Sequence, residues 1–314
     1  MKSKCVFTLF PFYPLNKARI HTPNFLISIL LFALIMVGCS RPKGFTKEKI
    51  LSKHAYNAQW NTFPMHQEEA KQIQSILKQR FAYLSSGNHC YVFESEDHNY
   101  VIKFFKQNHM RTHSLCNYLP PFIRHLLKRE EKNKRRQKER ETSFTSYKIA
   151  YEYLKEETGV LYLHLNKTTH LRQTLKLIDQ HNHFITLEAD KMEFLIQKKA
   201  LVGYKQIAIF LENKQEHEAF KAIESLLQIM IKRHRHGLFD CDLQIFKNFG
   251  FIGTQAIEID VGEFQIDPTQ ALSYKIIENL SETAQQIIEW VKQNYPTYLP
   301  LVTDKIQDVL QQID

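Results

Sequence analysis

Two neighbouring segments carry groups suited to binding phosphate. The segment 84–88 (LSSGN) lies between two runs of aromatic and β-branched residues, and Lys103 lies in the next such run. A flexible turn between strands can direct backbone N–H groups at a phosphate, and a lysine on the following strand can reach the same group. We therefore expect Ser86, Gly87, Asn88 and Lys103 to contribute to one phosphate-binding site.

Acidic residues and an asparagine gather in two later loops. Asp240 and Asp242 follow a long helical pattern, and Asn248 comes six residues after Asp242. Asp260 stands at the end of a predicted strand, directly before Val261 and Gly262. A phosphate-binding turn with its lysine, followed by two acidic loops, indicates a single site assembled from distant parts of the chain.

The hydrophobic periodicity predicts the elements that position these groups. We expect strands at 80–84, 89–95, 99–105, 160–165, 172–178, 183–188, 193–199, 249–253 and 255–260. We expect helices at 66–79, 128–156, 215–234, 281–294 and 302–312. Strands dominate the first half and helices the second, which predicts the α+β class rather than alternating βαβ units. We expect a tether and leading helix over 40–79, a strand-rich domain over 80–200 and a helical domain over 201–314.

At these residues the sequence resembles the protein-kinase-like fold, over roughly 80–265. The resemblance implies a strand-rich N-lobe with one long helix and a small helical C-lobe. It also implies transfer of the γ-phosphoryl group of ATP with Mg²⁺. Lys103 looks like the phosphate-binding lysine, and Asp242 looks like the catalytic-loop aspartate that orients the acceptor. Asn248 and Asp260 look like the metal ligands.

The resemblance leaves two assignments open. In the family an acidic residue of the long helix pairs with the strand lysine, and Glu141 and Glu152 are the candidates here. We favour Glu141, because it lies three residues before Phe144 on the apolar stripe. Asp240 is an alternative to Asp242 as the catalytic carboxylate, since both lie in the same loop.

The sequence also departs from the family pattern. The turn holds one glycine rather than three, and six residues rather than five separate Asp242 from Asn248. Cys241 stands at the family's arginine position, and only 54 residues follow Asp260. These departures indicate a compact, divergent relative. They leave a catalytically inactive binding or scaffold module as the alternative, and an envelope lipoprotein with accidental kinase likeness as a third interpretation.

Residues 1–39 predict membrane association, as a signal peptide or a membrane anchor. Residues 25–37 are thirteen uncharged, mostly apolar residues behind a basic stretch, which is typical of a signal peptide and short for a membrane span. Gly38-Cys39-Ser40 resembles the lipidation site of bacterial lipoproteins, so we expect Cys39 to carry lipid. An uncleaved anchor and a later start, at Met65 or Met110, are the alternatives.

The net charge of +9 has two local sources. Residues 1–38 hold four basic residues and no acidic one, and residues 128–140 hold eight basic and three acidic residues. The second stretch contains no aromatic residue, so we expect no nucleic-acid partner. A solvated helical face, or contact with an anionic membrane surface, is the expected role. The acceptor stays unassigned.

Overall fold

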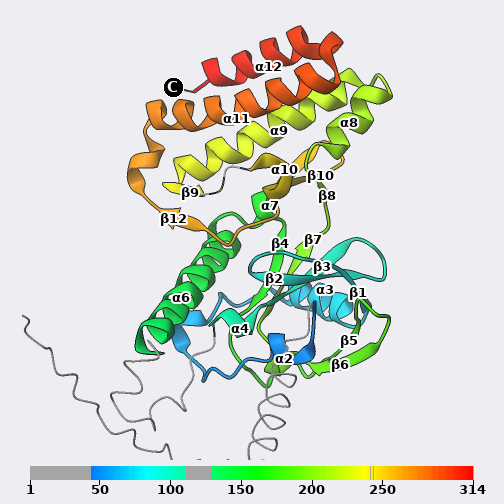
Figure 1. Ribbon diagram of the computed structural model, residues 1–314, viewed down its shortest axis with the longest axis vertical. Coiled ribbons are helices and arrows are strands. Elements are labelled where there is room, and N and C mark those ends of the chain that lie inside the picture. Colours follow the sequence, from blue (N-terminus) through cyan, green and yellow to red (C-terminus); the bar gives the residue numbers. More distant parts are fainter. Residues whose placement is uncertain (1–43, 111–128, 241, 243, 314) are drawn as a thin grey trace, which may run out of the picture. The chain divides into compact units, whose positions relative to one another are not determined.

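The computed structural model describes residues 44–110, 129–240, 242 and 244–313, and residues 44–314 form one compact unit (Figure 1). Seven strands make the main sheet, in the order β4-β7-β3-β2-β1-β5-β6. Their bounds are Arg80–Ser86 (β1), Cys90–Ser95 (β2), Tyr100–Phe105 (β3), Val160–His164 (β4), Thr174–Ile178 (β5), Phe184–Glu188 (β6) and Phe194–Lys198 (β7). Only the β1–β5 pair is parallel among them. With the helices below, this confirms the predicted α+β class.

Helix α6 (Arg129–Tyr153) packs its second half against this sheet. Phe144 and Tyr147 are buried, and their rings lie 5.1 and 5.0 Å from the ring of Phe105 on β3. The first half of α6 carries charged, mostly exposed side chains. The apolar stripe therefore packs the helix against the sheet, as the spacing of its aromatic residues predicts.

Short helices precede and flank the sheet. Helix α3 (Gln67–Leu77) starts with a capping box in which Glu69 accepts a hydrogen bond from the His66 amide. Three one-turn helices accompany it, α2 (Lys47–Ile50), α4 (Gln107–Met110) and α7 (Lys155–Thr158). Four 3₁₀ turns cover Ala58–Trp60, Ala189–Lys191, Pro268–Ala271 and Pro296–Tyr298.

Two small sheets hold the acidic loops. One pairs β8 (Leu201–Val202), β10 (Phe249–Ile252) and β11 (Gln255–Glu258) in the order β11-β10-β8. The other pairs β9 (Leu238–Asp240) with β12 (Phe264–Ile266), and Asp240 lies opposite Phe264 in its register. The second pair brings the chain before Asp242 alongside the chain after Asp260.

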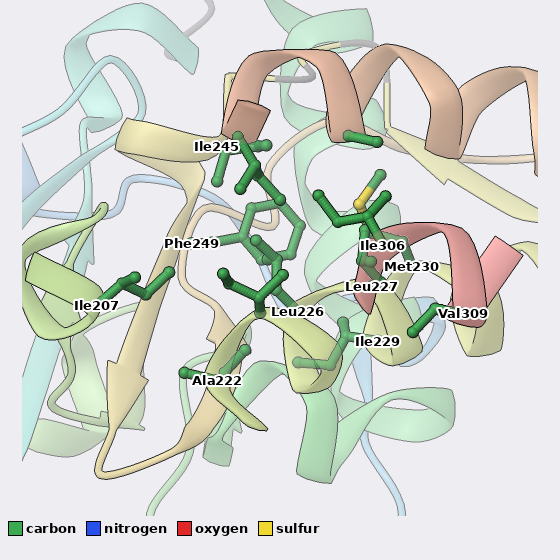
Figure 2. Close-up of a cluster of buried hydrophobic side chains, with 14 of the residues drawn as sticks. Ile207, Ala222, Leu226, Leu227, Ile229, Met230, Ile245, Phe249, Ile306 and Val309 are labelled. Atoms are coloured by element: carbon green, nitrogen blue, oxygen red, sulfur yellow. The ribbon is translucent and has the colours of Figure 1, made fainter. Parts of the chain in front are cut away.

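The carboxyl-terminal helices share one core (Figure 2). It joins α8 (Lys205–Glu212), α9 (Glu216–Arg235), α10 (Ile245–Asn248), α11 (Ser273–Asn294) and α12 (Leu299–Gln311). Leu226 and Leu227 of α9 lie between Phe249 of β10 and Ile306 of α12 in this cluster, all four almost completely buried. Because the loop after Asp240 leads through α10 into this core, the core fixes the loop at its far end.

Most predicted elements are confirmed to within two residues of their ends. The exceptions are α11, which begins at Ser273 rather than 281, α12, which begins at Leu299 rather than 302, and the long helix, which ends at Tyr153 and gives way to α7. Strands β8, β9 and β12 were not predicted. Each has two or three residues, too few to show a period.

Candidate active site

The turn between β1 and β2 forms one wall of a small cavity. The Gly87 amide donates to the Cys90 carbonyl at 3.0 Å, and Lys106 Nζ donates to the Gly87 carbonyl. Gly87 and Asn88 are exposed at the turn and line the cavity. Among the described residues, Ser85 rather than the predicted Ser86 joins them in this lining, after an irregularity in the β1–β2 register.

Lys103 lies in the middle of β3 and reaches into the same cavity. Its Nζ donates to the carbonyl of Ile259 at 2.5 Å, across 156 positions of the chain. Burial lowers the pKa of Lys103, and the negative charge of Asp260 opposes that change. The predicted lysine and the predicted aspartate therefore line one cavity.

The loop that carries Asp242 is held from both ends. The Asp242 amide donates to Asp240 Oδ1 at 3.0 Å, and Asn248 Nδ2 donates to the Asp242 carbonyl at 2.8 Å. Asp242 itself stays half-buried, with Oδ1 accepting from the Gln244 amide at 3.3 Å. Within the described part of the chain, the hydrogen bond of its carboxylate is thus a long one to its own loop.

Asn248 joins this loop to the segment of Asp260. Its carbonyl accepts from the amides of Ile259 and Asp260, at 2.7 and 3.2 Å. The Asp260 carboxylate is exposed, and the Asn248 side chain is buried with its amide group facing Asp242. Carboxylate and carboxamide oxygens are ligands of the type that Mg²⁺ accepts, and Mg²⁺ keeps several waters. Within the described ranges, no group of three His, Cys, Asp or Glu residues could hold a metal ion on its own.

A buried polar cluster, which the sequence did not predict, lies beneath the loop that carries Asp242. Arg233 pairs with Glu258, both 1% exposed, and Asp240 is 5% exposed. Burial raises the pKa of Asp240 to about 6, although the Asp242 amide and the charge of Arg233 lower it. Burial likewise raises the pKa of Glu258 against the opposing effect of Arg233. A signal existed, since Arg233 follows Leu226 by seven residues and Met230 by three, on the buried face of α9.

Neither candidate glutamate of α6 reaches Lys103, which corrects the predicted pairing. Glu141 is exposed and accepts a hydrogen bond from Gln137 at 2.9 Å. Glu152 lies 3.7 Å from Lys148. The face of α6 turned toward the cavity instead presents Tyr147, whose hydroxyl lies 3.5 Å from Cys90 Sγ.

Further residues line the cavity without having been predicted. Lys247, directly before Asn248, adds a second cation beside Lys103, and its place in the acidic loop was the available signal. Cys90 is buried, and burial raises the pKa of its thiol to about 11. The cavity therefore combines exposed backbone of the turn, two lysines and one carboxylate in about 120 Å³.

Ser146 ties α6 to the chain after Asp260. Its Oγ donates to the Val261 carbonyl and accepts from the Phe264 amide, both at 2.6 Å. The serine is completely buried. One side chain of α6 thus satisfies two buried backbone groups that flank Gly262.

The predicted membrane signals lie mostly outside the described residues. This holds for Cys39 and for 25–37, whereas residues 130–140 lie on α6. No helix in the described part of the chain has both the length and the apolar character needed to cross a membrane.

Comparison with known proteins gives similarities among solved structures only. No family model matches the sequence, and no curated protein matches it. One similar structure is described as the bifunctional kinase-methyltransferase WbdD, with 16% identity, 70% of this chain covered and a TM-score of 0.34. A 2.2 Å structure of WbdD shows 17% identity, covers 72% of this chain and has a TM-score of 0.33. The Rv3197–erythromycin complex from Mycobacterium tuberculosis shows 14% identity, covers 89% of this chain and has a TM-score of 0.31. The chain spans 43–45% of the length of WbdD and 71% of that of Rv3197.

Proposed function

We propose that this chain is an ATP- and Mg²⁺-dependent phosphotransferase of the protein-kinase-like superfamily. The observation that carries the proposal is the convergence of Lys103, Asp242, Asn248 and Asp260. Hydrogen bonds link the lysine to the carbonyl before Asp260, and link Asn248 to both aspartate-bearing segments. Lys103 of β3 and Asp260 after β11 thus line one cavity together with Lys247 of α10, whereas Asp242 and Asn248 do not line it and are connected to it through these hydrogen bonds. A site between a strand-rich and a helical lobe requires groups from these separate segments.

The residues divide between binding and positioning. In this proposal the backbone at Gly87 and Asn88, with Lys103, binds phosphates, and Asn248 and Asp260 hold Mg²⁺. The bound metal would neutralise charge on the transferred group. Asp242 would orient the acceptor hydroxyl, because its carboxylate is the more accessible one. Asp240 is enclosed and holds the loop instead.

An inactive binding module is the second candidate, and two observations favour it. The cavity of about 120 Å³ is smaller than the roughly 300–1,000 Å³ of ordinary small-molecule sites. Among the described residues, Lys103 also pairs with no carboxylate of α6, which is the orienting contact that the family resemblance implies. In this second candidate the chain folds as a kinase does but transfers no phosphoryl group.

Two measurements on the full chain test the proposal: release of labelled phosphate from Mg·ATP, and binding of Mg·ATP by calorimetry. We expect Asp260→Asn to lower turnover by about 100-fold or more, because it removes a charge that holds the metal. Its thermal midpoint should stay near wild type. The matched control is Asp308→Asn, an exposed aspartate of α12, which should leave turnover unchanged.

The outcomes separate the candidates. Turnover that survives in Asp260→Asn contradicts the site assignment. Binding of Mg·ATP without turnover in the wild type favours the inactive module. A folded wild type that neither binds nor turns over Mg·ATP contradicts the phosphotransferase and likewise favours the inactive binding or scaffold module.

We also propose that the chain is tethered to a membrane through Cys39. Labelling with a radioactive fatty-acid precursor should mark the wild type and not Cys39→Ser. Cys5→Ser, in the same segment, should be labelled as the wild type is. Equal labelling of both variants would contradict lipidation at Cys39.

A further inference from the structure

A second cavity lies beside the proposed active site. It has a volume of about 270 Å³ and is lined by residues of α6 and by the chain at Gly262 and Glu263. His89 lines both this cavity and the one that holds Lys103. A Cβ atom at Gly262 would lie 3.3 Å from His89 Cδ2, so the glycine allows the imidazole ring to lie against this backbone. The two cavities are therefore neighbours that share one side chain.

The charged side chains around the second cavity differ in whether they have an ion-pair partner. Glu139 pairs with Arg135 at 3.2 Å, and Glu263 Oε1 lies 3.6 Å from His89 Nε2. Lys138 also lines the cavity, and it forms no ion pair with any residue that the structure describes. Each acidic group thus has a nearby partner, although that of Glu263 is ionic only when His89 is protonated, and Lys138 is the charged group left for a ligand.

A buried hydroxyl points to the same chemistry. Ser143 is 2% exposed and lines the cavity, and its Oγ has no hydrogen-bond partner among the described residues. A buried polar group without a partner costs about 1–3 kcal/mol, so a ligand that supplies an acceptor is favoured there. Thr142 adds a second hydroxyl to the lining. An ammonium and two hydroxyls form a set of donors that suits an oxyanion.

We propose that this cavity binds the anionic group, a phosphate or a carboxylate, of a small molecule other than the nucleotide. Lys138 and Ser143 are its main contacts, and Arg135 can supply a further donor. This inference goes beyond the proposed function and does not depend on phosphoryl transfer. The anion has two possible sources: a free anion that acts as an effector, or an anionic group carried by a larger molecule such as the acceptor.

Calorimetry on the full chain at constant ionic strength tests the proposal, with inorganic phosphate and glycerol 3-phosphate as probes. We expect Lys138→Ala to weaken phosphate binding about tenfold or more, as expected for loss of a charged hydrogen bond. Ser143→Ala should weaken it too. Lys134→Ala is the matched control, because this exposed lysine of the same helix is absent from the cavity lining, and it should change affinity less than twofold.

Each outcome decides something. Equal affinity for both probes identifies a free anion, and tighter binding of the ester identifies a group on a larger molecule. Either result, with the loss confined to the cavity variants, supports the site. Equal losses in Lys138→Ala and Lys134→Ala, no binding by the folded wild type, or competition between phosphate and Mg·ATP overturns it. Because phosphate is measured without nucleotide, failure of the proposed function leaves this test intact.

Discussion

Asp240 and Asp242 show how two carboxylates in one loop acquire different roles. Asp240 is buried opposite Phe264 and accepts a hydrogen bond from the loop backbone, whereas Asp242 is half-buried and its carboxylate accepts a bond from the Gln244 amide of its own loop. Burial disfavours the charged form of the enclosed group. Asp240 therefore belongs to the support of the loop.

The raised pKa of Asp240 predicts a pH-dependent stability. Its pKa rises to about 6 in the folded protein from the ordinary 3.8, so folding favours its protonated form. The contribution of protonated Asp240 to the free energy of unfolding is complete below about pH 4, and it is lost as the pH rises through about 6. Relative to Asp240→Asn, the wild type should therefore lose about 2–3 kcal/mol of unfolding free energy between pH 4 and pH 8.

Urea unfolding of both proteins at several pH values measures this difference. Asp308→Asn, at an exposed position, should differ from the wild type by a nearly constant amount. Parallel pH curves for the wild type and Asp240→Asn would show that burial does not perturb this carboxyl group.

Some site residues leave a recognisable pattern in the sequence and others do not. Lys103, Asn248 and Asp260 occupy turns and strand positions of recognisable order, so their convergence could be predicted. The partner of Glu141 could not be predicted. A charged residue at the border of an apolar stripe faces the core or the solvent depending on a small change in helical phase. Arg233 stands among several cations in the last turn of α9, a common pattern at helix ends, although its phase places it inside.

At the scale of elements, α6 is held to the segment after Asp260 by Ser146 rather than by an ion pair to Lys103. We expect Ser146→Ala to lower the unfolding free energy by about 1–3 kcal/mol, because two buried backbone groups lose their partner. It should also lower turnover. Thr145→Ala, at an exposed neighbouring position of α6, should cost well under 1 kcal/mol. Similar costs for both variants in chemical denaturation would contradict this anchoring role.

The turn after β8 supports the acidic loop through a close backbone contact. Gly203 has φ +70°, and a Cβ atom there would lie 2.7 Å from the Phe246 carbonyl oxygen on α10. Gly253 has φ +60° and no atom within 4 Å of such a Cβ. Gly253→Ala should therefore cost only the left-handed strain, about 1–2 kcal/mol. Gly203→Ala should cost more, and it should also reduce turnover by displacing α10.

Thermal unfolding and turnover of the two alanine variants provide the comparison. Equal destabilisation would show that the contact with Phe246 relaxes without cost. Loss of activity in Gly253→Ala, and not in Gly203→Ala, would contradict the proposed support of the loop. The sequence alone could predict neither contact, because β8 has only two residues and leaves no periodic signal.

At the scale of the whole molecule, the charge is concentrated rather than spread. The basic stretch 128–140 lies largely on the exposed first half of α6, and contact with anionic lipid is the alternative to a merely solvated face. Replacing Lys132 and Lys134 with Gln should weaken binding of the full chain to phosphatidylserine vesicles by about fivefold per lysine. Co-sedimentation at low and high salt measures this effect.

A charge-matched control separates this stretch from the general charge of the protein. Lys214→Gln with Lys292→Gln removes two exposed lysines elsewhere and should leave vesicle binding nearly unchanged. Equal losses in both double variants would indicate attraction by net charge alone. The composition predicted where the charge lies, but only the fold shows that the same helix also lines a cavity.

The contact between Lys103 and the Ile259 carbonyl, beside a cavity of about 120 Å³, has a consequence for affinity. If the proposed function holds, a ligand of nucleotide size would need a wider conformation of this cavity. Its apparent dissociation constant then equals the intrinsic constant divided by the fraction of molecules in the wider state. A fraction of about one in a hundred weakens apparent binding a hundredfold without altering any contact to the ligand. Nucleotide affinity thus reports a population as well as an interaction.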